Sequence, residues 1–208
     1  FLGAYLVLAL LLQAGCRERS TFEKISSAHS GVFFQNTLLE SSELNVLTYE
    51  YFYNGSGVGV GDFNNDGLED LFFTSNMGSS RIYLNRGDFR FDDITDQSGI
   101  ATEGKWANGV SIIDINQDGH QDIYVCFSGP YASERRANEL YINNGDGTFT
   151  EMAEAYGLAD TSHSVQAAFF DFDLDGYLDM YLLNNMTDDT GPNVIRRKRA
   201  DGQMLNTD

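Results

Sequence analysis

The sequence is poor in proline, cysteine and basic residues. Its 208 residues include two prolines, two cysteines and three histidines, and 13 lysines and arginines stand against 31 acidic residues. Two cysteines do not make a disulfide framework. The formal net charge of −18 argues against a nucleic-acid partner, because proteins that bind nucleic acids normally present a basic face. Long hydrophobic runs are missing too, since the one near the N-terminus is shorter than the about 20 residues of a membrane-spanning helix.

That short apolar run has the length of the hydrophobic centre of a signal peptide. It is followed by Ala14-Gly15-Cys16, which resembles the cleavage box of bacterial lipoproteins, although Gln13 stands where leucine is usual. We therefore predict a signal peptide at 1–16 and an exported envelope protein that is held at the membrane only through a lipid on Cys16. An ordinary secretory signal that happens to contain a cysteine is the alternative.

Glycine and aromatic residues are abundant, with 21 Gly, 15 Phe and 11 Tyr, and this composition favours β structure. The acidic residues are concentrated in three loops that align without gaps, and each loop lies between two short apolar segments. The spacing of the loops indicates an internal repeat of about 50 residues. The three loops are Asp62–Asp70, Asp114–Asp122 and Asp171–Asp179.

The segments around each loop, such as Val58–Gly61 and Leu71–Phe73, are apolar on both faces, which is typical of strands covered on both sides. Two more strand-like segments follow in the first two repeats, joined by glycine-containing turns. We therefore predict an all-β fold, a β-propeller of four-stranded antiparallel blades. The blades are predicted at 57–101, at 107–160 and, stopping before its third strand, at 164–208. Cys126 is predicted to be a core residue of the second blade.

Residues 17–56 precede the first blade. Within them, Phe22–Ser26 followed by Gly31 resembles the fourth strand of the later blades, which is also followed by a glycine. We predict a lone strand there that completes the last blade of a ring, because such closure protects sheet edges. The chain is then expected to be about two and a half blades of a longer protein.

Each acidic loop follows the pattern Asp-x-[Asn/Asp]-x-Asp-Gly-x-x-Asp. Side-chain oxygens stand at positions 1, 3, 5 and 9, glycine at position 6 permits a sharp turn, and position 7 can offer its carbonyl. Ca²⁺ takes about 6–8 oxygens, whereas Mg²⁺ demands a stricter octahedron. Metal-free turns are the alternative, but bunched carboxylates repel one another without a cation. The predicted Ca²⁺ ligands are Asp62, Asn64, Asp66, Leu68, Asp70, Asp114, Asn116, Asp118, His120, Asp122, Asp171, Asp173, Asp175, Tyr177 and Asp179.

Loops and flanking strands together resemble the VCBS/FG-GAP repeats of integrin-α-type β-propellers over roughly residues 57–185. The VCBS variant of secreted bacterial proteins, some of which resemble cartilage acidic protein, is nearest, because the sequence has no Phe-Gly-Gly-Ala-Pro stretch. The resemblance implies a seven-bladed propeller with Ca²⁺ in the loop between the first and second strands of several blades.

The connections on the opposite face vary in length between repeats, as expected of binding loops on a rigid scaffold. Aromatic rings there could stack on a sugar, and basic side chains could hold an acidic glycan or protein; loop packing and a solvated charge run are the alternatives. The candidate partner-binding residues are Trp106, Tyr131, Arg135, Arg136, Arg196 and Arg197.

The sequence thus predicts a non-enzymatic, calcium-binding module on the cell surface that binds a glycan or a surface protein. None of the three histidines stands in a recognised catalytic or zinc-binding spacing. Two alternatives stay open, a non-catalytic part of a larger polysaccharide-acting enzyme and a structural scaffold of an envelope complex.

Overall fold

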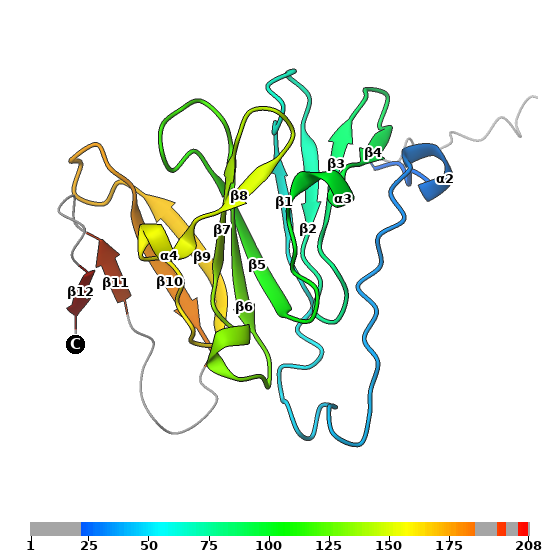
Figure 1. The fold of residues 1–208 in the computed structure, drawn as a ribbon. Coiled ribbons are helices and arrows are strands. Elements are labelled where there is room, and N and C mark those ends of the chain that lie inside the picture. Colours follow the sequence, from blue (N-terminus) through cyan, green and yellow to red (C-terminus); the bar gives the residue numbers. More distant parts are fainter. Residues whose placement is uncertain (1–21, 186–194, 199–203, 208) are drawn as a thin grey trace, which may run out of the picture.

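The computed structural model describes residues 22–185 and the backbone of two short strands at 195–198 and 204–207. Two four-stranded antiparallel sheets stand side by side, each with its strands in sequence order (Figure 1). The first sheet contains β1 (Val58–Gly61), β2 (Asp70–Phe73), β3 (Arg81–Asn85) and β4 (Phe91–Asp93). The second contains β5 (Trp106–Ile113), β6 (Asp122–Ser128), β7 (Glu139–Asn143) and β8 (Phe149–Glu151).

The third repeat begins with the antiparallel pair β9 (Ser164–Phe170) and β10 (Asp179–Asn184). β11 (Ile195–Lys198) and β12 (Met204–Thr207) pair with each other, whereas the sequence predicted that the chain stops before another strand of this repeat. β11 and β12 are close in sequence, and the repeat pattern does not predict their pairing. The predicted all-β fold with four-stranded antiparallel sheets is confirmed.

The sheets pack face to face because their central strands are apolar on both sides. Every residue of β6 is buried. Alternate side chains point to opposite faces, so Ile123 and Val125 join the core shared with the first sheet, and Tyr124 and Cys126 join the core shared with the third. Cys126 is fully buried, as predicted, and this burial raises the pKa of its thiol.

Each fourth strand leads into one helical turn, α3 (Thr95–Ser98) or α4 (Ala153–Tyr156), which ends at a glycine with positive φ. A 3-10 turn, η1 (Ser133–Arg135), lies between β6 and β7. No helix in the described residues is long and apolar enough to cross a membrane.

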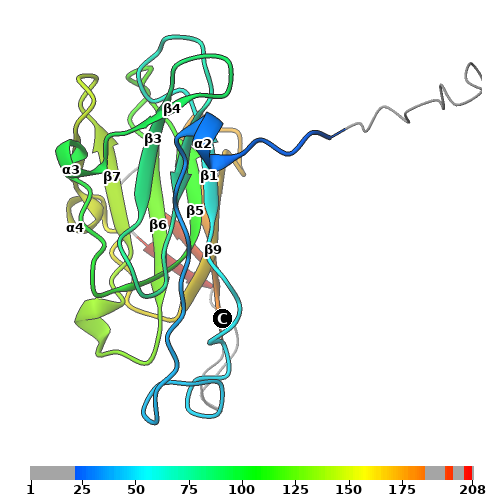
Figure 2. The same cartoon turned by 90° about the vertical axis from the view of Figure 1, so that its right-hand side faces the viewer.

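The lone strand predicted at residues 22–26 would pair with strands of a longer protein, so it stays a prediction. In the described residues the N-terminal segment forms no strand there, because no neighbouring segment pairs with it. It does contain the helical turn α2 (Ser27–Ser30), which ends at Gly31 with a φ of 76°. A Cβ on Gly31 would lie 2.6 Å from the carbonyl oxygen of Phe91. After α2 the chain runs down the face of the first sheet that is turned away from the second (Figure 2).

The same approach recurs one repeat later. A Cβ on Gly99 would lie 2.8 Å from the carbonyl oxygen of Phe149, and Phe149 begins β8 just as Phe91 begins β4. The segment around α2 therefore packs against the fourth strand of the first sheet in the same way as the end of the first sheet packs against the fourth strand of the second.

Candidate metal loops and comparison with known proteins

The three acidic loops lie along one edge of the molecule, the upper edge in Figure 1. The first aspartate of each loop is held in the same way. Asp62 accepts hydrogen bonds from the backbone nitrogens of Asp66, at 3.0 Å, and Gly67, at 2.7 Å. Asp114 and Asp171 accept the same pair from their own loops. The repeated sequence thus folds each loop around its first carboxylate.

The residue at the third position differs between the loops. In the first loop, the side-chain nitrogen of Asn64 donates to a carboxylate oxygen of Asp66 at 2.9 Å, and Asn116 donates to Asp118 at 2.8 Å in the second. The third loop has Asp173 at this position, and a carboxylate has no proton to donate. Carboxylate oxygens of Asp171, Asp173 and Asp179 lie within 4.8 Å of one another. At positions 1, 3, 5 and 9 the third loop therefore carries four carboxylates, whereas each of the other two loops carries three.

In the first two loops the ninth position ties the loop to the third strand of its sheet. Asp70 is fully buried and accepts hydrogen bonds from the backbone nitrogens of Phe63, at 2.8 Å, and Asn85, at 2.7 Å. Asp122 makes the equivalent contacts. Burial raises the pKa of both carboxyl groups above its usual range. A cation in the loop would offset the cost of keeping these carboxylates charged.

The seventh position donates its backbone nitrogen to the aspartate at the fifth, from Leu68 at 2.9 Å, His120 at 2.8 Å and Tyr177 at 2.9 Å. Their carbonyls as metal ligands stay a prediction.

The fourth position, which the sequence did not mark as functional, links neighbouring loops. Asn65 donates from its side chain to the carbonyl oxygen of Gly119 at 3.1 Å, and Gln117 donates to that of Gly176 at 3.1 Å.

The donor set fits a hard cation. The loop side chains at positions 1, 3, 5 and 9 offer carboxylate or carboxamide oxygens, and Ca²⁺ prefers oxygen ligands in an adaptable geometry. Backbone donors orient the first and last aspartates before any ion arrives. The carboxylates of the third loop already lie close enough to share one cation.

On the opposite face, the prediction for Trp106 as a partner-binding residue is wrong. Its side chain is 1% exposed, because Tyr49 and Phe52 pack against it at ring-centroid distances of 5.3 and 5.6 Å. These two rings come from a segment outside the repeats, so the repeat pattern gave no sign that they cover the indole.

The other candidates on this face are engaged in loop packing. Arg135 stacks on the ring of Tyr131, 3.9 Å from its centroid, and donates to the carbonyl of Gly104. Arg136 donates to the carbonyls of Tyr131 and Thr161. The side chains of Arg196 and Arg197, in β11, and the whole of Cys16 lie outside the described residues.

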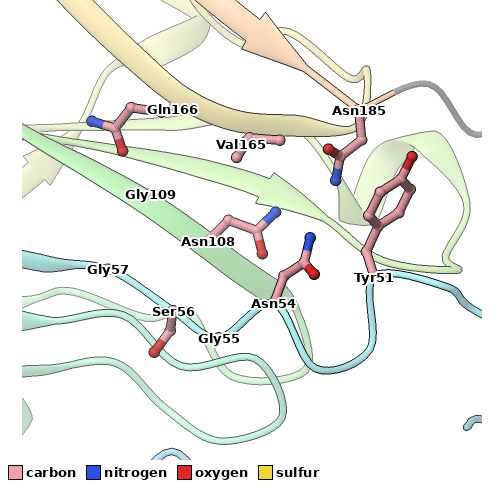
Figure 3. A pocket seen from close by; sticks show the side chains of 10 residues that line it. All are labelled: Tyr51, Asn54, Gly55, Ser56, Gly57, Asn108, Gly109, Val165, Gln166 and Asn185. Atoms are coloured by element: carbon pink, nitrogen blue, oxygen red, sulfur yellow. The ribbon is translucent and has the colours of Figure 1, made fainter. Parts of the chain in front are cut away.

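Sequence reasoning missed a pocket at the edge opposite the metal loops (Figure 3). Its volume is about 220 Å³, and it lies where the starts of β1, β5 and β9 converge. Aligning the repeats upstream of the metal loops would have brought its lining together. The lining residues are Tyr51, Asn54, Gly55, Ser56, Gly57, Asn108, Gly109, Val165, Gln166 and Asn185.

Among known proteins, the chain is 28% identical over 188 residues to cartilage acidic protein 1 of Xenopus tropicalis, which covers 88% of the chain and 27% of that protein. It is 32% identical over 133 residues to integrin alpha-8 of Gallus gallus, covering 56% of the chain and 12% of that protein. The chain thus spans about a quarter or less of the length of these relatives. The model of the FG-GAP-like repeat matches residues 62–125 and 127–182. The chain therefore belongs to the FG-GAP-like repeat family.

Proposed function

We propose that this chain is a calcium-binding β-propeller segment of a non-enzymatic, adhesion-type surface protein. The observation that carries the proposal is the threefold recurrence of one loop, with the first and last aspartates held by the same hydrogen bonds each time. Similarity to a protein named as an integrin alpha chain supports the adhesion class.

In this proposal Ca²⁺ would be held by the side chains at positions 1, 3, 5 and 9 and by the position-7 carbonyl of each loop. Bound there, it neutralises the carboxylates and stiffens the connection between the first and second strands. Asp70 and Asp122 accept hydrogen bonds from the backbone of β3 and β7 and so connect the first two loops to these strands.

The sheets are the blades of a ring, and the segment around α2 is the outer element of a blade that other parts of the full-length protein complete. The matching close approaches of Gly31 to Phe91 and of Gly99 to Phe149 support this arrangement. Seven blades remain the number implied by the family resemblance.

The protein is exported and anchored through Cys16, and its partner is a glycan or a surface protein bound on the face opposite the metal loops. A scaffold in an envelope complex is the second candidate, favoured by the engagement of Arg135 and Arg136 in packing.

Thermal melting of the full-length protein with Ca²⁺ and with chelator tests the metal, and an array of glycans and surface proteins tests the partner. We expect Asp118→Ala to lower the melting temperature only when Ca²⁺ is present. Asp96→Ala, which removes an exposed carboxylate outside the loops, should not. Equal melting temperatures of the wild type with and without Ca²⁺ would contradict the proposal, and so would an absence of calcium-dependent binding on the array.

A further inference from the structure

The pocket at the edge opposite the metal loops is built from equivalent positions of three successive repeats. Gly57 and Gly109 are such a pair, and neither tolerates a side chain. A Cβ on Gly57 would lie 2.8 Å from the carbonyl oxygen of Asn108, and one on Gly109 would lie 2.2 Å from that of Val165. The first strands therefore approach one another closely, and the pocket lies at their converging starts.

Both register shifts in the described strand ladders border this pocket. One lies between Ala107 and Val110 of β5, and the other between Leu183 and Asn184 of β10. A bulge re-aims a side chain and is common beside binding sites. Here the irregular stretches carry Asn108 and immediately precede Asn185.

The floor of the pocket is fixed by hydrogen bonds. Asn108 is nearly buried and donates to the carbonyl oxygen of Ser164 at 2.9 Å. Beneath it, the fully buried Asn76 donates to the carbonyl oxygens of Gly55, at 3.0 Å, and Ala107, at 2.9 Å. A rigid polar floor of this kind is pre-organised for a polar ligand.

Two further carboxamides face the opening from opposite sides. Figure 3 shows the side chains of Asn54 and Asn185 directed toward one another with Asn108 between them, while Gln166 and Ser56 point elsewhere. In the part of the chain that the structure describes, no hydrogen bond to protein occupies the amide of Asn54 or Asn185. Gln166 is engaged with the carbonyl oxygen of Val110 at 3.1 Å.

The lining also contains one aromatic ring and has no charged side chain. Tyr51 stands beside Asn185 at the mouth of the pocket (Figure 3), and its hydroxyl is hydrogen-bonded to Glu50. The ten lining residues include no charged side chain, although the chain carries 31 acidic residues.

We propose that this pocket binds one neutral sugar residue of a glycan. Each carboxamide offers a donor and an acceptor together, which matches sugar hydroxyls that also both donate and accept. An apolar ligand would cover the amides without pairing them, which is unfavourable. An acidic sugar would meet no basic side chain in the lining.

The size of the pocket suits one sugar ring, since a volume of about 220 Å³ is small for a ligand site. The inference rests on the proposed function as a surface binding module and narrows its partner from a glycan or protein to a neutral saccharide.

The test uses the full-length protein in Ca²⁺ on an array that holds neutral glycans, glycans with uronic or sialic acids, and proteins. Affinity for the best neutral hit is then measured by calorimetry for the wild type, Asn54→Ala, Asn185→Ala and the control Asn144→Ala, which removes an exposed carboxamide outside the pocket. We expect each asparagine variant to bind about tenfold more weakly, as the loss of about 1.4 kcal/mol predicts. The control should bind as the wild type does, and melting temperatures should confirm that all variants fold.

Three outcomes would overturn the inference. These are binding of acidic glycans or proteins alone, equal affinity of the asparagine variants and the wild type, and no saccharide binding at all. Melting with and without Ca²⁺ on the same samples separates this inference from the proposed function. A calcium-stabilised protein that binds only other partners would refute the sugar site and leave the adhesion module standing.

Discussion

Asp173 is the residue at which the third metal loop departs most from the other two. Asn64 and Asn116 use their amides to shield the neighbouring aspartate, and Asp173 cannot. Like charges at short range disfavour the fully ionised state unless a cation is present. The third loop should therefore gain the most from Ca²⁺ and lose the most without it.

We expect Asp173→Asn to weaken Ca²⁺ binding to the third loop and to raise the melting temperature in chelator. The reverse change in the second loop, Asn116→Asp, should strengthen binding there and lower the melting temperature in chelator. Calorimetric titration and melting curves of both variants check the pair. Equal behaviour of the two variants would show that the third position does not set loop affinity.

Glu139 is a buried carboxylate away from the metal loops. It is hydrogen-bonded to Lys105 and accepts a second bond from the hydroxyl of Tyr141 at 2.6 Å. Burial raises the pKa of Glu139, and the hydrogen bond with Lys105 lowers it in part. Removing Lys105 therefore raises the pKa of Glu139 further.

When the pKa of a carboxyl group is higher in the folded state than in the unfolded state (about 4.3 for glutamate), the stability of the protein falls as the pH rises. We expect Lys105→Met to cost little near pH 4 and about 3 kcal/mol near pH 7, where Glu139 is left charged and unpaired. Urea unfolding at both pH values measures the difference. In Lys105→Met/Glu139→Gln the cost should not change with pH, and a pH-independent cost in the single variant would argue against this account.

At the scale of elements, the metal loops form a connected row. Asn65 and Gln117 have φ values of 57° and 59°, so replacing either with glycine removes the side chain without backbone strain. We expect Asn65→Gly to speed amide hydrogen exchange in the second loop by about threefold to tenfold, the worth of one lost hydrogen bond. Gln117→Gly should do so in the third loop. Faster exchange spread evenly over all loops would contradict direct coupling between neighbours.

The strands and loops were predictable where the sequence pattern is local. The loop pattern identifies Asp62 to Asp70 as a turn between strands, and alternation places Cys126 in a core. The burial of Trp106 was not predictable, because Tyr49 and Phe52 come from a segment with no counterpart in the repeats. The carboxamide pocket was also missed, since it exists only where three repeats meet.

At the scale of the whole molecule, one face of the first sheet is strongly apolar and open. Val58 is 56% exposed, whereas Val110, at the equivalent position of the second sheet, is 8% exposed because the first sheet covers it. Val60 is 52% exposed as well. The N-terminal segment covers part of this face, since Phe34 stacks on Phe73 at 5.0 Å. The proposed ring covers the rest with a further blade.

The equivalent valines give a direct test of that ring in the full-length protein. If a blade packs on the first sheet, Val58→Lys buries a charge just as Val110→Lys does, and each should cost more than about 2 kcal/mol in chemical unfolding. If the face is open to solvent, Val58→Lys should stay within about 0.5 kcal/mol of the wild type while Val110→Lys remains destabilising. We expect the first result, because Gly31 already approaches the first sheet as Gly99 approaches the second. A neutral Val58→Lys beside a destabilised Val110→Lys would mean that the sheets form an open array rather than a closed propeller.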